Sequence, residues 1–181
     1  MKIQGFTLIE LLVTLAMIAI TLTMGVPAFQ HTIHSNQLTT QSNNFIAIMN
    51  LARHEAIKRG IRVSVCASDQ AEAGNAAMTL CTGAWNKGWL VFTDADGNCT
   101  LDAGTDTTLR VHEGLSNKTT FSAKTLDTTP ANVTCTGFLP SGEITKTNTG
   151  IKFVICDSAI KKSREITLNV VGHLSSAVGS C

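Results

Sequence analysis

The chain lacks an excess of charge of either sign. Fourteen lysines and arginines oppose 13 aspartates and glutamates across 181 residues, so the formal net charge is +1. A protein that binds a polyanion over a broad surface carries a basic excess. The overall charge therefore argues neither for a nucleic-acid-binding surface nor for an acidic one.

Charged side chains are almost absent from residues 6–29. This stretch has no lysine, arginine or aspartate, and Glu10 is its one charged residue. As a helix it would extend about 36 Å, which is enough to cross a bilayer. The small residues near Ala16 lie inside the run, whereas a secretory signal peptide has a shorter apolar core with its cleavage site beyond it. The pattern predicts a transmembrane helix with Lys2 on the cytoplasmic side.

Glu10 is energetically unusual within such a segment. An unpaired carboxylate inside a membrane costs roughly 2.5–3.5 kcal/mol on insertion scales, so intramembrane acids are usually functional. Its place at the start of the segment suggests a protein that is first held in a membrane and later enters a packed helical assembly. Pro27 removes a backbone donor and predicts a kink or a looser turn nearby.

Closely spaced cysteine pairs are also lacking. None of the six cysteines has the Cys-x-x-Cys spacing of a zinc knuckle or a thiol redox centre. An even number of widely spread cysteines beyond a membrane anchor indicates disulfides in an oxidising compartment. Sequence alone allows 15 pairings. Nearest-neighbour loops suggest Cys66–Cys81, Cys99–Cys135 and Cys156–Cys181.

The apolar segment is predicted to continue as an amphipathic helix. Its stripe recurs at three- and four-residue spacing through Leu38, Ser42, Phe45, Ile48 or Met49, Ala52 and Ala56. Lys58 and Arg59 suit a last turn, and Gly60 suits the position just past it. One helix from Phe6 to about Arg59 is the simplest interpretation.

The remainder of the chain is predicted to form β-strands that cover the stripe. The fold class is α+β, with a long N-terminal helix packed against an antiparallel β-domain of two small sheets with disulfides. Short β-branched runs bounded by Gly, Asn, Asp and Pro predict strands at 62–66, 88–92, 108–112, 119–122, 133–135, 151–156 and 164–171.

The run Gly5-Phe6-Thr7-Leu8-Ile9-Glu10-Leu11 resembles the processing site of type IV prepilins and the related pseudopilins. The resemblance implies that a prepilin peptidase cleaves between Gly5 and Phe6 and that the new amine on Phe6 is methylated. It also implies that Glu10 pairs with the N-terminal amine of a neighbouring subunit. A proline near Pro27 occurs in the same family.

Further patches extend the resemblance over most of the chain. They are similar to the FimT/FimU group of minor type IV pilins, whose relatives are the GspH-type minor pseudopilins, and they comprise residues 38–45, 51–60, 63–66, 88–94 and 138–142. Residues 67–86 and 125–131 contribute little. The resemblance implies a type IV pilin fold.

DNA binding is a rival function. FimT-like pilins that bind DNA carry a Gly-Arg-x-Arg motif near the C-terminus, but the matching position here reads Gly172-His173-Leu174-Ser175. Lys161, Lys162 and Arg164 form a basic turn nearby that could contact phosphates. The missing arginines favour the FimU-like branch and a structural function.

Catalytic and metal chemistry finds little support. The five histidines lack the context of a nucleophile and base, so neither an enzyme nor a cofactor is predicted. Asp94, Asp96 and Asn98 fit an EF-hand loop, but Cys99 stands at the glycine position and Thr105 at the final glutamate position. A tight acidic turn is the better interpretation, and no metal site is predicted.

The sequence thus predicts a minor pilin that helps to prime a type IV pilus at or near its tip. We expect a leader at 1–5, a transmembrane or filament-core half of the helix at 6–29, an amphipathic half at 30–59 and a β-domain at 60–181. Its expected partners are other major and minor pilins, the prepilin peptidase, the inner-membrane assembly platform and the membrane before assembly. It would start as a single-pass inner-membrane protein with a periplasmic C-terminal domain and end in the extracellular pilus. A type II secretion pseudopilin, or a DNA-binding pilin for transformation, would be the alternative.

Overall fold

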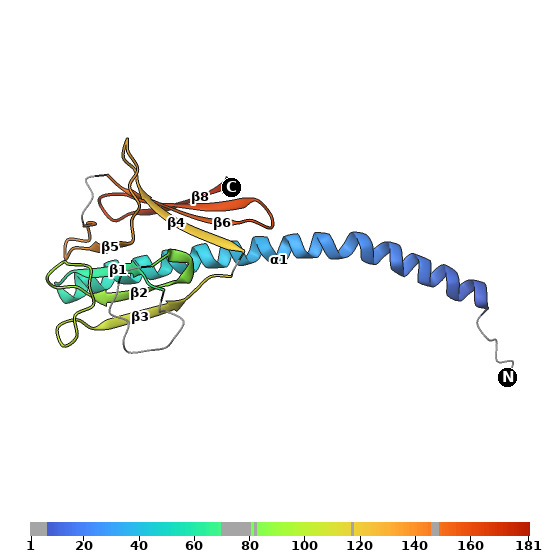
Figure 1. Ribbon diagram of the computed structural model, residues 1–181, viewed down its shortest axis with the longest axis horizontal. Helices are drawn as coiled ribbons and strands as arrows, with labels where there is room; N and C mark the ends of the chain where they lie inside the picture. The colour runs from blue at the N-terminus through green and yellow to red at the C-terminus, as the bar shows by residue number, and fades with distance from the viewer. Residues whose placement is uncertain (1–6, 70–80, 82, 117, 146–148) are drawn as a thin grey trace.

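The computed structural model describes residues 7–69, 81, 83–116, 118–145 and 149–181. One long helix carries a β-domain on its second half, while its first half extends away from that domain (Figure 1). The helix α1, Leu8–Arg59, has 52 residues and is about 78 Å long. It ends at Gly60, which has a φ of 66° and donates its N–H to the Ala56 carbonyl, as a glycine past a last turn does. The sequence predicted this end.

The helix is continuous through residue 27. Figure 1 shows a gentle bend in its first half, whereas the half that carries the β-domain is nearly straight.

One face of the second half is buried under the β-domain. The buried positions are those of the predicted stripe: Leu38, Ser42, Phe45, Met49, Ala52 and Ala56. Their three- and four-residue spacing keeps them on one side of the helix, and this side contacts strands from both sheets.

The first sheet has the strand order β3-β2-β1-β5, and all of its pairs are antiparallel. Its strands are β1 (Val63–Ala67), β2 (Gly88–Thr93), β3 (Thr108–Glu113) and β5 (Cys135–Phe138), and a short 3-10 helix, η2 (Trp85–Lys87), precedes β2. Every residue of β1 and β2 is buried, so both faces of these central strands are covered. One face lies toward α1. On the other, Leu101 from the β2–β3 connection packs with Cys66, Leu90 and Phe92.

The second sheet has the order β4-β6-β7-β8, again antiparallel throughout. Its strands are β4 (Thr119–Thr125), β6 (Ile151–Asp157), β7 (Lys162–Leu168) and β8 (Leu174–Ser180). Alternate residues of β4 and β6 are buried, as expected for strands with one face on a core. The predicted α+β class with two small antiparallel sheets is confirmed.

Three strand predictions differ from the structure. The run expected at 164–171 starts earlier and ends at Leu168, because Asn169 and Gly172 form a turn whose backbone groups bond to each other. The run expected at 133–135 begins only at Cys135, since Val133 still donates to Ala123 of β4. Strand β8 was not expected at all: its serine- and glycine-rich sequence lacks β-branched alternation, and it forms by pairing along β7.

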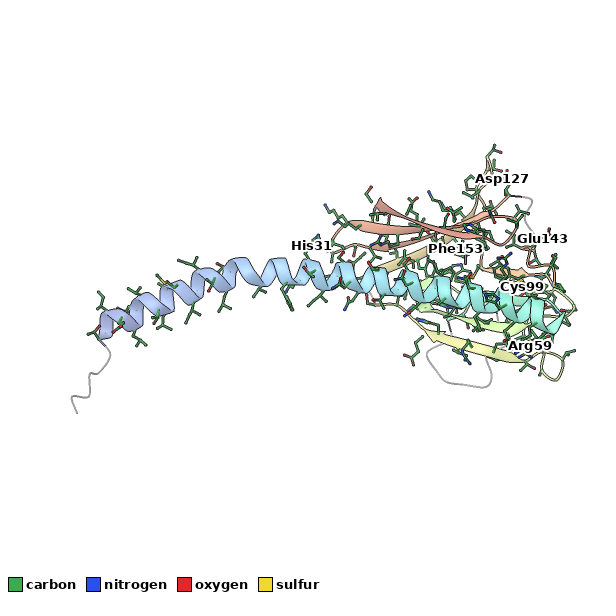
Figure 2. The ribbon with its side chains drawn as sticks, turned by 180° about the vertical axis from the view of Figure 1, so that it is seen from behind. His31, Arg59, Cys99, Asp127, Glu143 and Phe153 are labelled. Carbon is green, nitrogen blue, oxygen red and sulfur yellow. A yellow bond between two sulfur atoms is a disulfide. The ribbon has the colours of Figure 1, made fainter. Side chains whose placement is uncertain are left out.

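The core is centred on Phe45 of α1. Its ring contacts Trp85, Trp89, Phe121 and Phe153 at centroid distances of 5.8, 5.4, 4.9 and 4.8 Å, mostly edge to face. Phe153, labelled in Figure 2, comes from the second sheet, whereas Trp89 comes from the first. One helical side chain therefore joins both sheets to the helix.

Candidate functional site

The first turn of α1 presents Glu10. Thr7 caps the helix, and its Oγ1 accepts a hydrogen bond from the Glu10 backbone N–H at 3.4 Å. The Glu10 side chain is exposed, next to the positive end of the helix dipole. Gly5 and Phe6 lie outside the described residues, so cleavage and methylation there stay predictions.

The first half of α1 exposes large apolar side chains around its whole circumference. Leu8 is 76% exposed and Phe29 is 68% exposed, and between them the described large apolar residues are at least 49% exposed. Polar groups in this region are mostly threonines that bond to carbonyls within their own turn. An exposed apolar surface of this length marks a contact with other proteins or with lipid.

Within the described part of the chain, no helix meets the length and hydropathy of a membrane span. A membrane-spanning function for residues 6–29 therefore stays a prediction.

Two contacts fix the β-domain where the helix leaves it, a region called the neck here. His34 Nδ1 lies 3.0 Å from Asp157 Oδ2 at the end of β6. Arg164 Nη2 of β7 donates to Thr39 Oγ1 of α1 at 2.9 Å. Both bonds join the second sheet to the helix, so they help to set the orientation of the β-domain on α1.

The basic turn of the sequence is divided by the structure. Lys161 and Lys162 are exposed, but Arg164 is half-buried because its guanidinium is turned to Thr39 on α1. The three cations therefore do not form one free surface. DNA binding by these three residues stays a prediction.

The acidic turn after β2 is organised by its own side chains. Asn98 Nδ2 donates to Oδ2 of Asp96 at 2.7 Å and to Oδ2 of Asp102 at 2.9 Å. Asp94 is fully buried and its Oδ2 accepts from Ser64 Oγ, while Arg62 Nε lies 3.4 Å away. The described residues contain no group of three or more His, Cys, Asp or Glu side chains that could hold a metal. The contacts describe a hydrogen-bonded turn.

Three disulfides are present: Cys66–Cys81, Cys99–Cys135 and Cys156–Cys181. These are the nearest-neighbour pairs that the loop lengths suggested. Three cysteines of the first two bonds, Cys66, Cys81 and Cys135, pack with Leu90 and Phe92 in the small apolar cluster on the outer face of the first sheet. The third disulfide joins Cys181, just beyond the edge strand β8, to β6.

A further structural residue, Arg53, was not singled out by its sequence. Arg53 Nε donates to the Gly142 carbonyl and its Nη2 to the Val171 carbonyl, each at 3.0 Å. The helix thereby holds two turns that lie far apart in the sequence. The stripe spacing could have revealed His34, which stands four residues before Leu38, but nothing local could have revealed the partners of Arg53.

An apolar helix that is bare over its first half, and that carries a disulfide-bonded β-domain on its second half, defines a pilin-type subunit. The fold matches the type IV minor pilin FimU of Pseudomonas aeruginosa, with 20% identity and a TM-score of 0.57 over 79% of this chain and 90% of that one. It also matches the minor pseudopilin EpsH of the type II secretion system of Vibrio cholerae, with 13% identity and a TM-score of 0.51 over 78% of this chain and 96% of that one.

The chain belongs to the family described as type II transport protein GspH, whose sequence profile matches residues 41–172. The prokaryotic N-terminal methylation motif matches residues 1–26. No curated protein sequence matches closely. The predicted minor pilin or pseudopilin class, with its type IV pilin fold, is confirmed.

Proposed function

We propose that this chain is a minor pilin that enters a type IV pilus at low copy, at or near the tip, and helps to prime assembly with other minor pilins. The observation that carries the proposal is the bare apolar first half of α1, with Glu10 in its first turn. A FimU-like fold and the N-terminal methylation motif support it. The role is structural and needs neither catalysis nor a cofactor.

The chain would pass through a membrane-anchored stage. A prepilin peptidase removes residues 1–5 by cutting between Gly5 and Phe6, and the Phe6 amine is methylated. Residues 6–29 then hold the protein in the inner membrane as a single pass, with residues 30–59 and the β-domain at 60–181 on the periplasmic side. The three disulfides suit that oxidising compartment.

Assembly would exchange lipid for neighbouring helices. At the assembly platform, the first half of α1 leaves the bilayer and packs among the helices of other pilins in the filament core. This packing extends from the start of the helix to the region of Pro27. Glu10 forms an ion pair with the N-terminal amine of a neighbouring subunit, the group that Phe6 carries in this chain. A buried carboxylate is tolerated when it gains such a partner, and it also selects one register among the apolar helices.

Replacing Glu10 tests this function. We expect the Glu10→Ala chain to be processed normally but to be depleted from sheared pili, because the carboxylate acts after cleavage. Thr14→Ala, one turn further along the same exposed segment, is the control and should enter filaments normally. Immunoblots of membranes and of sheared pili measure both steps. Normal incorporation of Glu10→Ala would refute the pairing role.

A type II secretion pseudopilin is the second candidate, favoured by the family description and by the fold shared with EpsH. Deleting the gene separates the two machines. Loss of piliation and twitching with intact secretion supports the pilus, whereas the reverse result assigns the chain to secretion. Loss of DNA uptake, with piliation, twitching and secretion unchanged, would refute both assignments.

A further inference from the structure

The β-domain ends in a lysine cluster at the point where the helix leaves it. The cluster comprises Lys118, Lys161 and Lys162, called the neck lysines here, and all three are exposed. Ser158 of the β6–β7 turn donates its N–H and its hydroxyl to the Lys118 carbonyl at 3.1 and 3.0 Å, so Lys118 lies against that turn. Figure 1 shows the β6–β7 turn as the end of the second sheet that is closest to the free half of α1.

No described acidic side chain pairs with the neck lysines. The acidic side chain just before the turn, Asp157 at the end of β6, is buried against His34 and also accepts from the Ala159 N–H. Glu165, on β7, is paired with Lys152 at 2.6 Å. At the corresponding end of the first sheet, Lys87 and Glu113 flank the same β-pair and offset each other. The positive charge is therefore specific to the second sheet.

The cluster lies close to the depth expected for lipid headgroups. His34, which bonds to the same turn, is five residues beyond Phe29, or about 7.5 Å along the helix. A headgroup layer is about 5–7 Å thick on each side of the hydrocarbon core. Electrostatic attraction acts over a Debye length of about 8 Å at physiological ionic strength. With residues 6–29 in the bilayer, His34 would lie at the outer edge of the headgroup layer, and the turn beside it would lie within about a Debye length of the phosphates.

We propose that the neck lysines bind the anionic headgroups of the bilayer that anchors α1 and hold the β-domain against the membrane until assembly. The inference rests on the proposed membrane-anchored stage. The helix inserts the protein into the bilayer, while the lysines select anionic lipids and orient the β-domain. Each cation near an anionic surface strengthens the contact about fivefold. Extraction into a filament then requires breaking this contact as well as removing the helix from lipid.

A lipid surface is a better match for these lysines than duplex DNA. The β6–β7 turn lies at the end of the second sheet nearest the free half of α1 (Figure 1), so an extended ligand there would meet that half of the helix, whereas a bilayer would surround it. Arg164, the one side chain of the basic turn with a planar fork for phosphate, is already bonded to Thr39. Lys118, from the connection between β3 and β4, is the third cation of the cluster instead of Arg164.

Amine labelling of the full chain tests the proposal. The chain is inserted into nanodiscs of phosphatidylcholine, or of the same lipid with added phosphatidylglycerol, and treated with a soluble amine-reactive reagent. Mass spectrometry then gives the labelling rate of each lysine. In anionic nanodiscs the rates at Lys118, Lys161 and Lys162 should fall about threefold or more. Lys58 and Lys124, also exposed, should be unaffected.

Salt and paired variants complete the test. Raising ionic strength to about 0.5 M shortens the Debye length to about 4 Å and should restore labelling. Lys161→Asn with Lys162→Gln should abolish the lipid effect at Lys118; asparagine suits the positive φ of 52° at position 161. Lys58→Gln with Lys124→Gln makes the same charge change and should leave protection intact.

The outcomes separate this proposal from the function that it rests on. A chain that does not enter neutral nanodiscs overturns the membrane-anchored stage and this inference with it. A chain that inserts but shows equal labelling in both lipids overturns this inference alone. Protection of the same lysines by duplex DNA in neutral nanodiscs, without an effect of anionic lipid, would assign the cluster to nucleic acid.

Discussion

His34 and Asp157 form a polar link between the helix and the β-domain, with 3.0 Å between Nδ1 and Oδ2. Asp157 is buried at the end of β6, and its other oxygen, Oδ1, accepts from the Ala159 N–H. His34 stands one turn before Leu38, so it extends the buried stripe with a polar residue at the edge of the domain.

Removing His34 should loosen the neck. His34→Ala leaves the buried Asp157 oxygen without its partner, and we expect a loss of about 1–3 kcal/mol in the free energy of unfolding. Urea denaturation of the full chain in detergent, followed by tryptophan fluorescence, measures it, because Trp85 and Trp89 both lie in the core. The exposed His31 is the control: His31→Ala should change stability by less than about 0.5 kcal/mol. Equal effects of the two changes would contradict the link.

Truncating Phe45 should be far more damaging. Phe45→Ala removes the ring that joins both sheets to α1 and leaves a cavity, at an expected cost of about 3–5 kcal/mol. Phe29→Ala deletes the same group at a position that is 68% exposed, and we expect little change in the unfolding of the β-domain. The same fluorescence-detected urea titration compares the two. A loss below about 1 kcal/mol for Phe45→Ala would refute its central role.

Opening the third disulfide should release one edge of the second sheet. Cys156→Ala with Cys181→Ala removes a cross-link over 25 residues, which is worth about 3.5 kcal/mol. Apart from its ladder with β7, strand β8 has little other anchorage, since most of its residues are exposed. Hydrogen exchange should therefore accelerate in β8 well before β6 or β7. Uniform acceleration across the sheet would show that the disulfide stabilises the domain as a whole.

Gly172 should tolerate no side chain. Its φ is +79°, and a Cβ there would collide with the Gly142 carbonyl, which already accepts from Arg53. Gly104 is a matched control, because its φ is +90° but nothing lies within 4 Å of an added Cβ. Backbone strain of about 1–2 kcal/mol should therefore appear in both alanine variants. Gly172→Ala should cost at least about 2 kcal/mol more than Gly104→Ala in the same titration, and similar losses would show that only strain matters.

The sequence revealed those parts of the fold that depend on local periodicity. The spacing of Leu38, Phe45 and Ala52 predicted the buried face of α1, and Gly60 marked its end, because helical geometry converts spacing directly into a common face. Strands rich in β-branched and aromatic residues, such as β2 and β6, were equally apparent.

Contacts between distant segments could not be predicted in the same way. The two carbonyl partners of Arg53 lie 89 and 118 residues away, on turns that come together only when both sheets pack on α1. Strand β8 forms because β7 offers a free edge, and its own residues have little preference for a strand. The sequence indicated a surface cation at Arg164, because its partner on the helix, Thr39, lies 125 residues earlier.

The disulfides also decide how the subunit responds to mechanical load. The Cys99–Cys135 bond closes a ring of 36 residues that includes β3 and β4, one strand from each sheet. Unclosed, that segment could lengthen to roughly 120 Å under tension. Closed, it cannot extend, and force entering on one side of the ring passes through the sulfur atoms to the other. Under tension, the residues between Cys99 and Cys135 therefore add no length to the chain.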